Sequence, residues 1–379
     1  MALDLTAKRV QRDVDVVARA GLDLDEFVSE ALDSIARAVP HVASCFATVD
    51  PSTLLLTGTL KGGALYRDDT HDHEWGLLEY GNVETTAFME LAHRAVPAVA
   101  TVAASPGSPR LNEFMRPNFG FGDELRLVLR DRGQCWGGLA IFREEGEARF
   151  DEHDVELLAS LSESMSVGVR SGILSRLRST APSLPPVGPA VVIIGADDRV
   201  LQVSAGAEQR LNELLTDMND GDPGGIIASL VGAARRFASG AAVRPPRSRV
   251  RARSGMWLVL HATPLSPRDG RGGDVVVTID EARPPEIVPL VVAAFDLTQR
   301  ERDVTERVLQ GMDTKEIAAS MHLSAYTVQD HLKSVFAKTD VRSRRELVAR
   351  IYFDQYVPRM GTDVGPSGWF VAGSAEPPA

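Results

Sequence analysis

The chain has 379 residues, of which 44% are hydrophobic and 25% are charged, so it is long enough for two or three globular domains with buried cores. Its net charge of −11 excludes a protein that binds nucleic acid over its whole surface. Its two cysteines, Cys45 and Cys135, are too few for a disulfide framework and fall within expected strands, which favours buried thiols in a reducing compartment.

Residues 1–12 are polar and charged and contain no apolar signal region. The longest uncharged run, residues 179–196, contains four prolines and cannot cross a membrane as a single helix. We therefore expect a cytoplasmic protein that does not contact a membrane.

The first half of the chain is predicted to contain a helix, a sheet and a long closing helix. Apolar spacing predicts the first helix at residues 24–39, where Pro40 ends it. Strands are predicted at 42–49, 54–60, 125–130 and 135–142, the last two as a hairpin. Within residues 71–122 only 85–95 is predicted to be helical, and the rest is expected to form loops.

The closing helix is predicted to begin after Asp151, with Asp154 supporting its first turn, and to reach roughly 40 Å. Its apolar stripe consists of Val155, Leu158, Leu161, Met165, Val169, Ile173 and Leu177. The spacing approaches a heptad repeat, so a coiled-coil-like dimer contact is one interpretation. A single helix packed across a sheet is the other, and both stay open.

This order of elements resembles a GAF domain, an α/β sensory fold. The motifs that carry the resemblance are Asp-Glu-Leu at 123–125, Cys-Trp-Gly-Gly-Leu at 135–139 and Phe-Asp-x-x-Asp at 150–154. The resemblance implies a GAF-like domain at residues 1–178 with a small-molecule pocket between the sheet and the mid-domain loops. It specifies no ligand, because GAF ligands range from nucleotides to haem to none, so the cofactor is unknown.

A proline-rich linker is expected at residues 179–189, followed by a second α/β module at 190–285. A strand pair, a helix near 207–215 and a three-strand meander make this module similar to a PAS domain. Arg247, Arg249, Arg251 and Arg253 alternate along one predicted strand and share one face. They either bind an anion or form a solvated or acid-paired face, and the second interpretation is favoured in an acidic protein.

The C-terminal region, residues 290–358, is predicted to form four short helices. Three helix starts place a capping oxygen three residues before a glutamate, as in a capping box. The pairs are Thr298 with Glu301, Asp313 with Glu316, and Ser343 with Glu346. Ser324 caps the remaining helix without a glutamate, and turns are expected at Gly311, near His322 and at Asp340.

The apolar positions of these helices predict a compact all-α core. It consists of Val304, Val308, Ile317, Met321, Leu323, Val328, Leu332, Val335 and Phe336. The third helix then presents Thr327, Gln329, Asp330, Lys333 and Lys338 outward. A helix presented in this way by the helix before it is how a helix-turn-helix enters the major groove of DNA.

Charge is distributed unevenly and favours DNA contact by this region alone. Residues 297–351 contain ten Lys and Arg against eight Asp and Glu, a net charge of +2 that leaves −13 for the rest of the chain. Between residues 333 and 350 the balance is six against two. Such a locally basic end predicts modest DNA affinity that falls as salt concentration rises.

The region resembles the C-terminal DNA-binding domain of LuxR-type transcription regulators. The shared motifs are Thr-x-Arg-Glu at 298–301, Lys-Glu-Ile-Ala at 315–318, Ser-x-x-Thr-Val at 324–328, His331 and Val-Arg-Ser-Arg at 341–344. The resemblance implies that Gln329, Asp330 and Lys333 face the bases. It assigns DNA-backbone contacts to Lys315, Ser324, Thr327, Lys338, Arg342 and Arg344. Many relatives carry a basic residue in place of Gln329 and a neutral one in place of Asp330, which changes the expected base preference.

Signs of catalysis or metal binding are weak. The sequence contains no Walker A loop and no G-x-S-x-G nucleophile motif. The cluster from His71 to Glu74 is favoured as a solvated loop over a metal site, because adjacent loop positions point in different directions. We expect no metal and no catalytic residues, and a disordered tail at residues 359–379.

The sequence thus predicts a multidomain α+β bacterial regulator that binds double-stranded DNA, most readily as a homodimer, with RNA polymerase as a further partner. The alternative is a signalling enzyme or ligand-regulated scaffold whose helical module docks another protein.

Overall fold

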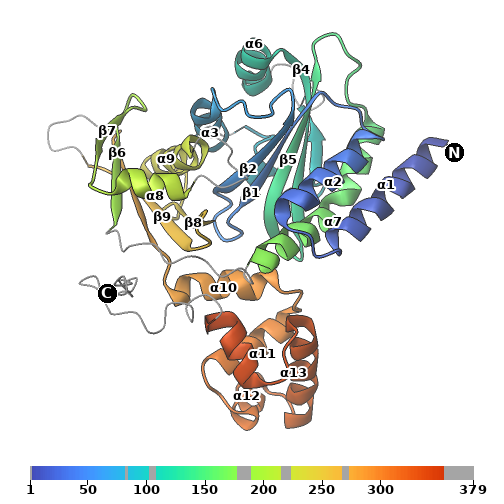
Figure 1. Ribbon diagram of the computed structural model, residues 1–379, viewed down its shortest axis with the longest axis vertical. Helices are drawn as coiled ribbons and strands as arrows, with labels where there is room; N and C mark the ends of the chain where they lie inside the picture. The colour runs from blue at the N-terminus through green and yellow to red at the C-terminus, as the bar shows by residue number, and fades with distance from the viewer. Residues whose placement is uncertain are drawn as a thin grey trace, which may run out of the picture. The chain divides into compact units, whose positions relative to one another are not determined.

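The computed structural model describes residues 2–81, 84–101, 108–176, 189–214, 223–266 and 273–353. The chain forms two compact units, the first containing both β-sheets and the second containing the C-terminal helices from Ala282 onward (Figure 1). None of the described helices has the length and apolar content needed to cross a membrane. Except for Pro189, the expected linker at residues 179–189 lies outside the described residues, and so does the whole of the expected disordered tail at residues 359–379. The domain boundaries stay predictions.

The first sheet is antiparallel with the strand order β2-β1-β5-β4-β3. Its strands are β1 (Ala43–Val49), β2 (Leu56–Gly63), β3 (Ala98–Ala100), β4 (Phe121–Asp131) and β5 (Gln134–Glu144). The four predicted strands and the β4–β5 hairpin are confirmed, and only β3 was missed. Arg132 and Gly133 occupy the two-residue turn with φ angles of 49° and 79°, the positive values that a tight hairpin of this twist requires.

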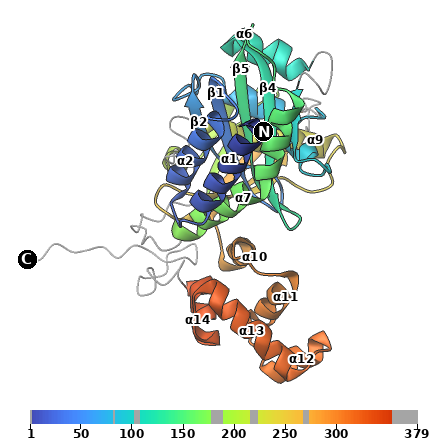
Figure 2. The ribbon, with the colours of Figure 1, turned by 90° about the vertical axis from the view of Figure 1, so that its right-hand side faces the viewer.

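Helices α1 (Ala2–Ala18), α2 (Leu24–Ala36) and α7 (Glu152–Arg176) lie together on one side of this sheet (Figure 2). The α7 residues Leu158, Leu161, Met165 and Val169 are at most 1% exposed, and a Cβ atom on Gly168 would lie 2.1 Å from the Phe27 ring of α2. Because the chain itself buries the middle of the predicted stripe, α7 is a helix packed across a sheet, and these four residues cannot form a coiled-coil contact.

The prediction that most of residues 71–122 forms loops is wrong, because short helices occupy much of this segment. The described part of this segment contains α3 (Asp72–Gly81), α4 (Phe88–Leu91), the π-helix η1 (Arg110–Met115) and α6 (Arg116–Phe119) in addition to β3. The predicted helix at 85–95 shrinks to the single turn of α4. Trp75, Phe88 and Leu111 pack with Cys45 and Phe142 of the sheet in one buried cluster.

The second sheet is also antiparallel, with the order β7-β6-β10-β9-β8. Its strands are β6 (Ala190–Ile194), β7 (Val200–Val203), β8 (Arg247–Arg251), β9 (Trp257–Pro264) and β10 (Val275–Glu281). Between the strand pair and the meander lie α8 (Ala207–Glu213) and α9 (Gly224–Ala238), of which α9 was not predicted. When the strands are numbered within each sheet, both sheets have the order 2-1-5-4-3.

Helices α3 and α9 join the two halves of the first unit, each of which contains one sheet. Helix α9 packs against α3 of the first half and against the sheet of its own half. A Cβ atom on Gly76 of α3 would lie 2.9 Å from the carbonyl oxygen of Gly225 and 2.9 Å from the Cβ of Ala228, both in α9. Further along the pair, a Cβ atom on Gly232 would lie 2.8 Å from the amide nitrogen of Gly81. The glycines therefore let the two backbones approach more closely than any side chain would permit.

A buried ion pair makes the second connection. Arg249 of β8 donates from Nε and Nη2 to the Asp50 carboxylate at 2.7 and 2.6 Å, and the two residues are 4% and 1% exposed. Burial alone would raise the pKa of Asp50, but the hydrogen bonds and charge of Arg249 hold that pKa below its ordinary value. Of the arginines predicted to share a face, Arg249 pairs with an acidic neighbour, and the Arg251 guanidinium lies 5.3 Å from the Trp257 ring centroid.

Helices form the described part of the second unit from residue 282 onward. They are α10 (Pro284–Ala294), α11 (Gln299–Leu309), α12 (Thr314–Met321), α13 (Ala325–Thr339), α14 (Arg344–Val348) and η2 (Ala349–Phe353). The four predicted helices correspond to α11–α14, and α10 was not predicted. The fold class is therefore mixed α+β, with two antiparallel sheets and a C-terminal helical domain.

Candidate nucleic-acid interface

Reciprocal hydrogen bonds fix the starts of α11 and α12. The Thr298 hydroxyl accepts from the Glu301 amide at 3.3 Å, and the Glu301 carboxylate accepts from the Thr298 amide at 2.7 Å. Asp313 and Glu316 form the same pair of bonds at 2.9 and 2.7 Å. The amides of Glu316 and Lys315 lower the pKa of Asp313, since they stabilise its ionised form.

The start of α14 differs from the expected capping box. Ser343 does accept a bond from the Glu346 amide at 3.2 Å, but the Glu346 carboxylate accepts from the amide of Arg342 and not from that of Ser343. The backbone of Ser343 is extended, with φ −152° and ψ 161°, so the preceding amide faces the glutamate.

A tight turn presents α13 to solvent. The helix α12 ends at His322, whose φ of +56° reverses the chain direction, and the Ser324 hydroxyl accepts from the Thr327 amide at 3.0 Å to begin α13. Val328, Leu332 and Val335 form the buried side of α13, at most 5% exposed. This arrangement is a helix-turn-helix with a rigidly supported second helix.

Glu301 links the first and third helices of the domain as well as capping the first. Its side chain is 6% exposed and accepts from Ser334 Oγ at 2.5 Å and from Lys338 Nζ at 2.7 Å. Burial would raise the pKa of Glu301, but the hydrogen bonds from Lys338, Ser334 and Thr298 lower it to about 2. Glu301 is therefore ionised at neutral pH and holds α13 against α11.

The outer side of α13 carries one exposed stripe. Tyr326, Gln329, Asp330 and Lys333 occupy positions i, i+3, i+4 and i+7 and are all exposed. Tyr326 was missing from the predicted site, although it is 72% exposed and its spacing from the other three places it on the same face. Lys333 Nζ lies 3.2 Å from Asp330 Oδ1, so the two charges of the stripe are paired.

The residues predicted to contact the DNA backbone fall into two groups. Lys315, Ser324 and Arg342 are exposed, and Thr327 is half-buried at the start of α13. Lys338 is instead paired with Glu301. Arg344 donates to the Met312 carbonyl at 2.7 Å and to the Thr314 hydroxyl at 2.9 Å, which ties α14 to the turn before α12.

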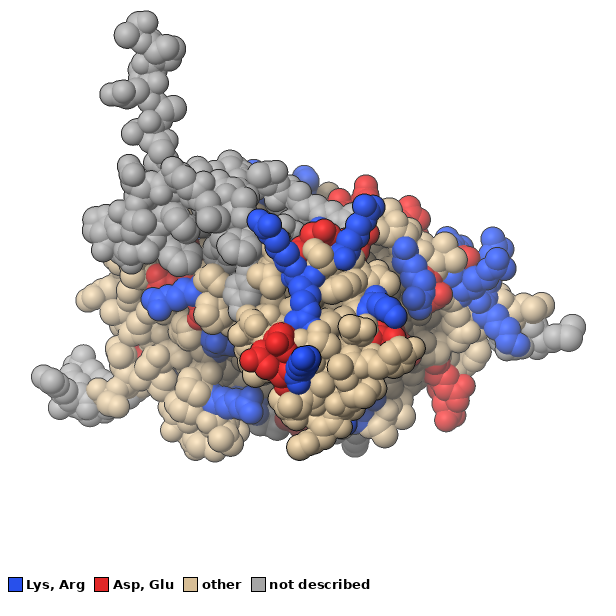
Figure 3. Space-filling view, turned by 90° about the horizontal axis from the view of Figure 1, so that it is seen from below, with Lys and Arg blue, Asp and Glu red and all other residues tan. Residues whose placement is uncertain are grey.

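On the face shown in Figure 3, Lys and Arg side chains are spread over the surface, several of them beside an Asp or Glu, and do not form one continuous patch. Across the described ranges, no three His, Cys, Asp or Glu side chains are placed to hold a metal ion.

Comparisons with known proteins agree on this domain. Residues 296–351 match the family described as bacterial regulatory proteins, luxR family. The monoamine regulon transcriptional regulator of Klebsiella aerogenes is 43% identical over 56 residues, which are 15% of this chain and 25% of that protein. The transcriptional regulatory protein UhpA of Escherichia coli (strain K12) is 45% identical over 56 residues, which are 15% of this chain and 29% of that protein. The chain thus spans about a quarter of the length of these relatives.

Similar solved structures include the nlh2 GAF domain of A. aeolicus in an inactive state, with 14% identity and a TM-score of 0.30. That similarity covers 47% of this chain and 99% of the solved one. Residues 296–351 therefore form a helix-turn-helix domain that matches the luxR family of bacterial regulatory proteins, with α12 and α13 as its two central helices.

Proposed function

We propose that the whole chain is a transcriptional regulator that places α13 in the major groove of double-stranded DNA, under the control of its first unit. The observation that carries the proposal is the exposed stripe of Tyr326, Gln329, Asp330 and Lys333 on a helix whose opposite side is buried. Residues near the start of a recognition helix are those that reach base edges. We also propose that the chain acts by binding and not by catalysis, in the cytoplasm of a bacterium.

The side chains of the stripe suggest a base preference. Gln329 is suited to the N6 and N7 atoms of adenine, Asp330 accepts from the N4 amino group of cytosine, and Lys333 donates to O6 or N7 of guanine. Asp330 also repels phosphate, so it weakens binding to any sequence that offers it no amino group. Lys315 and Arg342, both exposed, are the proposed phosphate contacts, together with Ser324 and Thr327 at the start of α13.

A homodimer follows from the size of the reading surface. One short helix reads only a few base pairs, and two copies on adjacent half-sites restore useful specificity. We therefore propose that two copies of the chain bind one operator and that RNA polymerase is the partner on which the bound dimer acts.

The test is selection of binding sites from random double-stranded DNA with the full chain, followed by anisotropy titration of the selected sequence. The Lys333→Glu variant should lose binding, and Arg199→Glu is the matched control because its side chain is 85% exposed and lies in the other unit. If both variants lose binding equally, net charge and not α13 governs the interaction. If selection enriches no sequence, the proposed function is wrong.

A further inference from the structure

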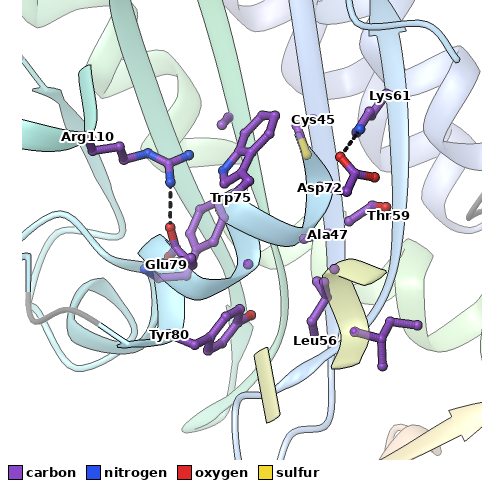
Figure 4. A pocket seen from close by; sticks show the side chains of 15 residues that line it. Cys45, Ala47, Leu56, Thr59, Lys61, Asp72, Trp75, Glu79, Tyr80 and Arg110 are labelled. Carbon is purple, nitrogen blue, oxygen red and sulfur yellow. Dashed lines mark hydrogen bonds and ion pairs between the residues drawn. The ribbon is translucent and has the colours of Figure 1, made fainter. Parts of the chain in front are cut away.

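A pocket of about 590 Å³, counting the space that opens to solvent, lies between the first sheet and α3 (Figure 4). Its floor is formed by Cys45 and Ala47 of β1, Leu56, Thr59 and Lys61 of β2, and Ala140 of β5. Its roof is one face of α3, formed by Asp72, Trp75, Gly76, Glu79 and Tyr80 at helical spacing.

The second half of the unit closes this pocket. Gly225 and Ile226, at the start of α9, complete the wall beside Leu56. The same Gly225 lies against Gly76 in the close contact between α9 and α3. The pocket is therefore composite, and a molecule inside it touches two helices that belong to different sheets.

The charges in the pocket cancel one another. Four charged residues line it, and they form two ion pairs. Lys61 pairs with Asp72, and Arg110 donates from Nη1 to Glu79 at 3.0 Å. Behind the wall, Arg110 also contacts Glu124 at 3.1 Å and Arg126 contacts Glu79 at 2.7 Å, so two arginines balance two glutamates in the buried cluster. A charged ligand would bring an unpaired charge into this environment, and burying such a charge is strongly unfavourable.

Uncharged groups that can recognise a ligand remain. Tyr80 is 2% exposed, its hydroxyl forms no hydrogen bond in the structure, and in Figure 4 that hydroxyl points toward Leu56. Trp75 and Phe88 supply aromatic surface, and Arg110 and Lys61 lie 5.2 and 5.8 Å from the Trp75 ring centroid. A buried hydroxyl without a partner is destabilising unless a bound group satisfies it.

We propose that this pocket binds a small, uncharged, planar molecule with one group that hydrogen-bonds to the Tyr80 hydroxyl. The flat body of the ligand lies against Trp75 and Phe88, and α9 covers one side of it. Occupancy changes the contact between α3 and α9, which connects the ligand to the second sheet. The proposal deepens the proposed control of DNA binding by the first unit, and it is tested without DNA.

The experiment measures binding of matched probes to the full chain by saturation-transfer NMR and calorimetry. The probes are indole with indole-2-carboxylate and nicotinamide with nicotinate, pairs that differ mainly in a carboxylate charge. We expect at least one uncharged probe to bind saturably and its carboxylate partner to bind about tenfold more weakly or not at all. Binding of the carboxylates as tight as that of the uncharged probes, or no saturable binding by either uncharged probe, would overturn the proposal.

Two variants locate the site. Ile226→Trp fills the pocket from α9 and should abolish probe binding, while Tyr80→Phe keeps the ring and should weaken binding about fivefold by removing one hydrogen bond. Tyr66→Phe is the matched control, because Tyr66 is 62% exposed and undergoes the same chemical change. Unchanged binding by both pocket variants would place the probes elsewhere. Failure here leaves DNA binding by α13 standing, and loss of DNA binding in Lys333→Glu leaves this site standing.

Discussion

Replacing Glu301 with Gln should destabilise the helix-turn-helix domain by about 3 kcal/mol at neutral pH. The carboxylate receives bonds from the Thr298 amide, Ser334 and Lys338, and its pKa falls from an ordinary 4.5 to about 2. Since a tenfold change in proton affinity corresponds to about 1.4 kcal/mol, a pKa lowered from 4.5 to about 2 corresponds to about 3.5 kcal/mol. The side chain is almost fully buried, so solvent screening removes little of this value.

Hydrogen exchange followed by mass spectrometry on the full chain is the appropriate assay, because it reports on the peptides of α11 and α13 separately from the first unit. Amides that exchange through opening of the domain should exchange on the order of 100-fold faster in Glu301→Gln. Glu306→Gln, an exposed change on the same helix, should alter exchange little. An acceleration below about fivefold in Glu301→Gln would refute the argument that this carboxylate holds α13 to α11.

Four further changes have defined outcomes. Arg249→Met should destabilise the first unit by about 3–5 kcal/mol, measured by urea unfolding followed by tryptophan fluorescence, because it leaves the buried Asp50 carboxylate without its partner. Adding Asp50→Leu removes that carboxylate and should recover most of the loss, and equal loss in the single and double variants would contradict this. As pH falls, the stabilisation from ionised Glu301 should begin to decrease below about pH 4.5 and be lost by about pH 2 in the native chain, and it should be absent at every pH in Glu301→Gln, which acid titration of the exchange rates checks. Arg342→Ala should weaken binding to all DNA sequences alike and reduce the salt slope by about one contact, whereas loss of discrimination alone would show that Arg342 reads bases. Gly76→Val should separate α3 from α9, because its Cβ atom would lie 2.9 Å from the Cβ of Ala228. The separation should appear as faster amide exchange in both helices, and unchanged exchange would show that the two backbones move apart at no cost.

The helix-turn-helix domain was predictable because its signals are local. Thr298 and Asp313 each stand three residues before the glutamate that completes the cap, and both reciprocal bonds form. The turn at His322 and the buried side of α13 follow from the next few residues along the chain. Only the detail at Glu346 differed, because the backbone angle of Ser343 decides which amide faces the carboxylate.

The junction within the first unit could not be predicted in the same way. Asp50 and Arg249 are 199 positions apart, and nothing near either residue indicates its partner. The helix α3 contains Gly76 and ends at Gly81, residues that ordinarily argue against a helix. Their role becomes visible only once α9 lies against them, so a local reading assigns this segment to a loop.

Under the proposed function, the charges of the helix-turn-helix domain favour weak DNA binding by a single copy, which would make control by the first unit effective. Residues 297–351 have a net charge of only +2, and Asp330 pairs with the one lysine of the reading stripe. Lys338 and Arg344 are engaged in holding the domain together and are less available to phosphate. Two such domains on adjacent half-sites gain affinity in proportion to the effective concentration of the second. A change that brings the two domains together or separates them therefore alters operator occupancy without altering any residue of α13.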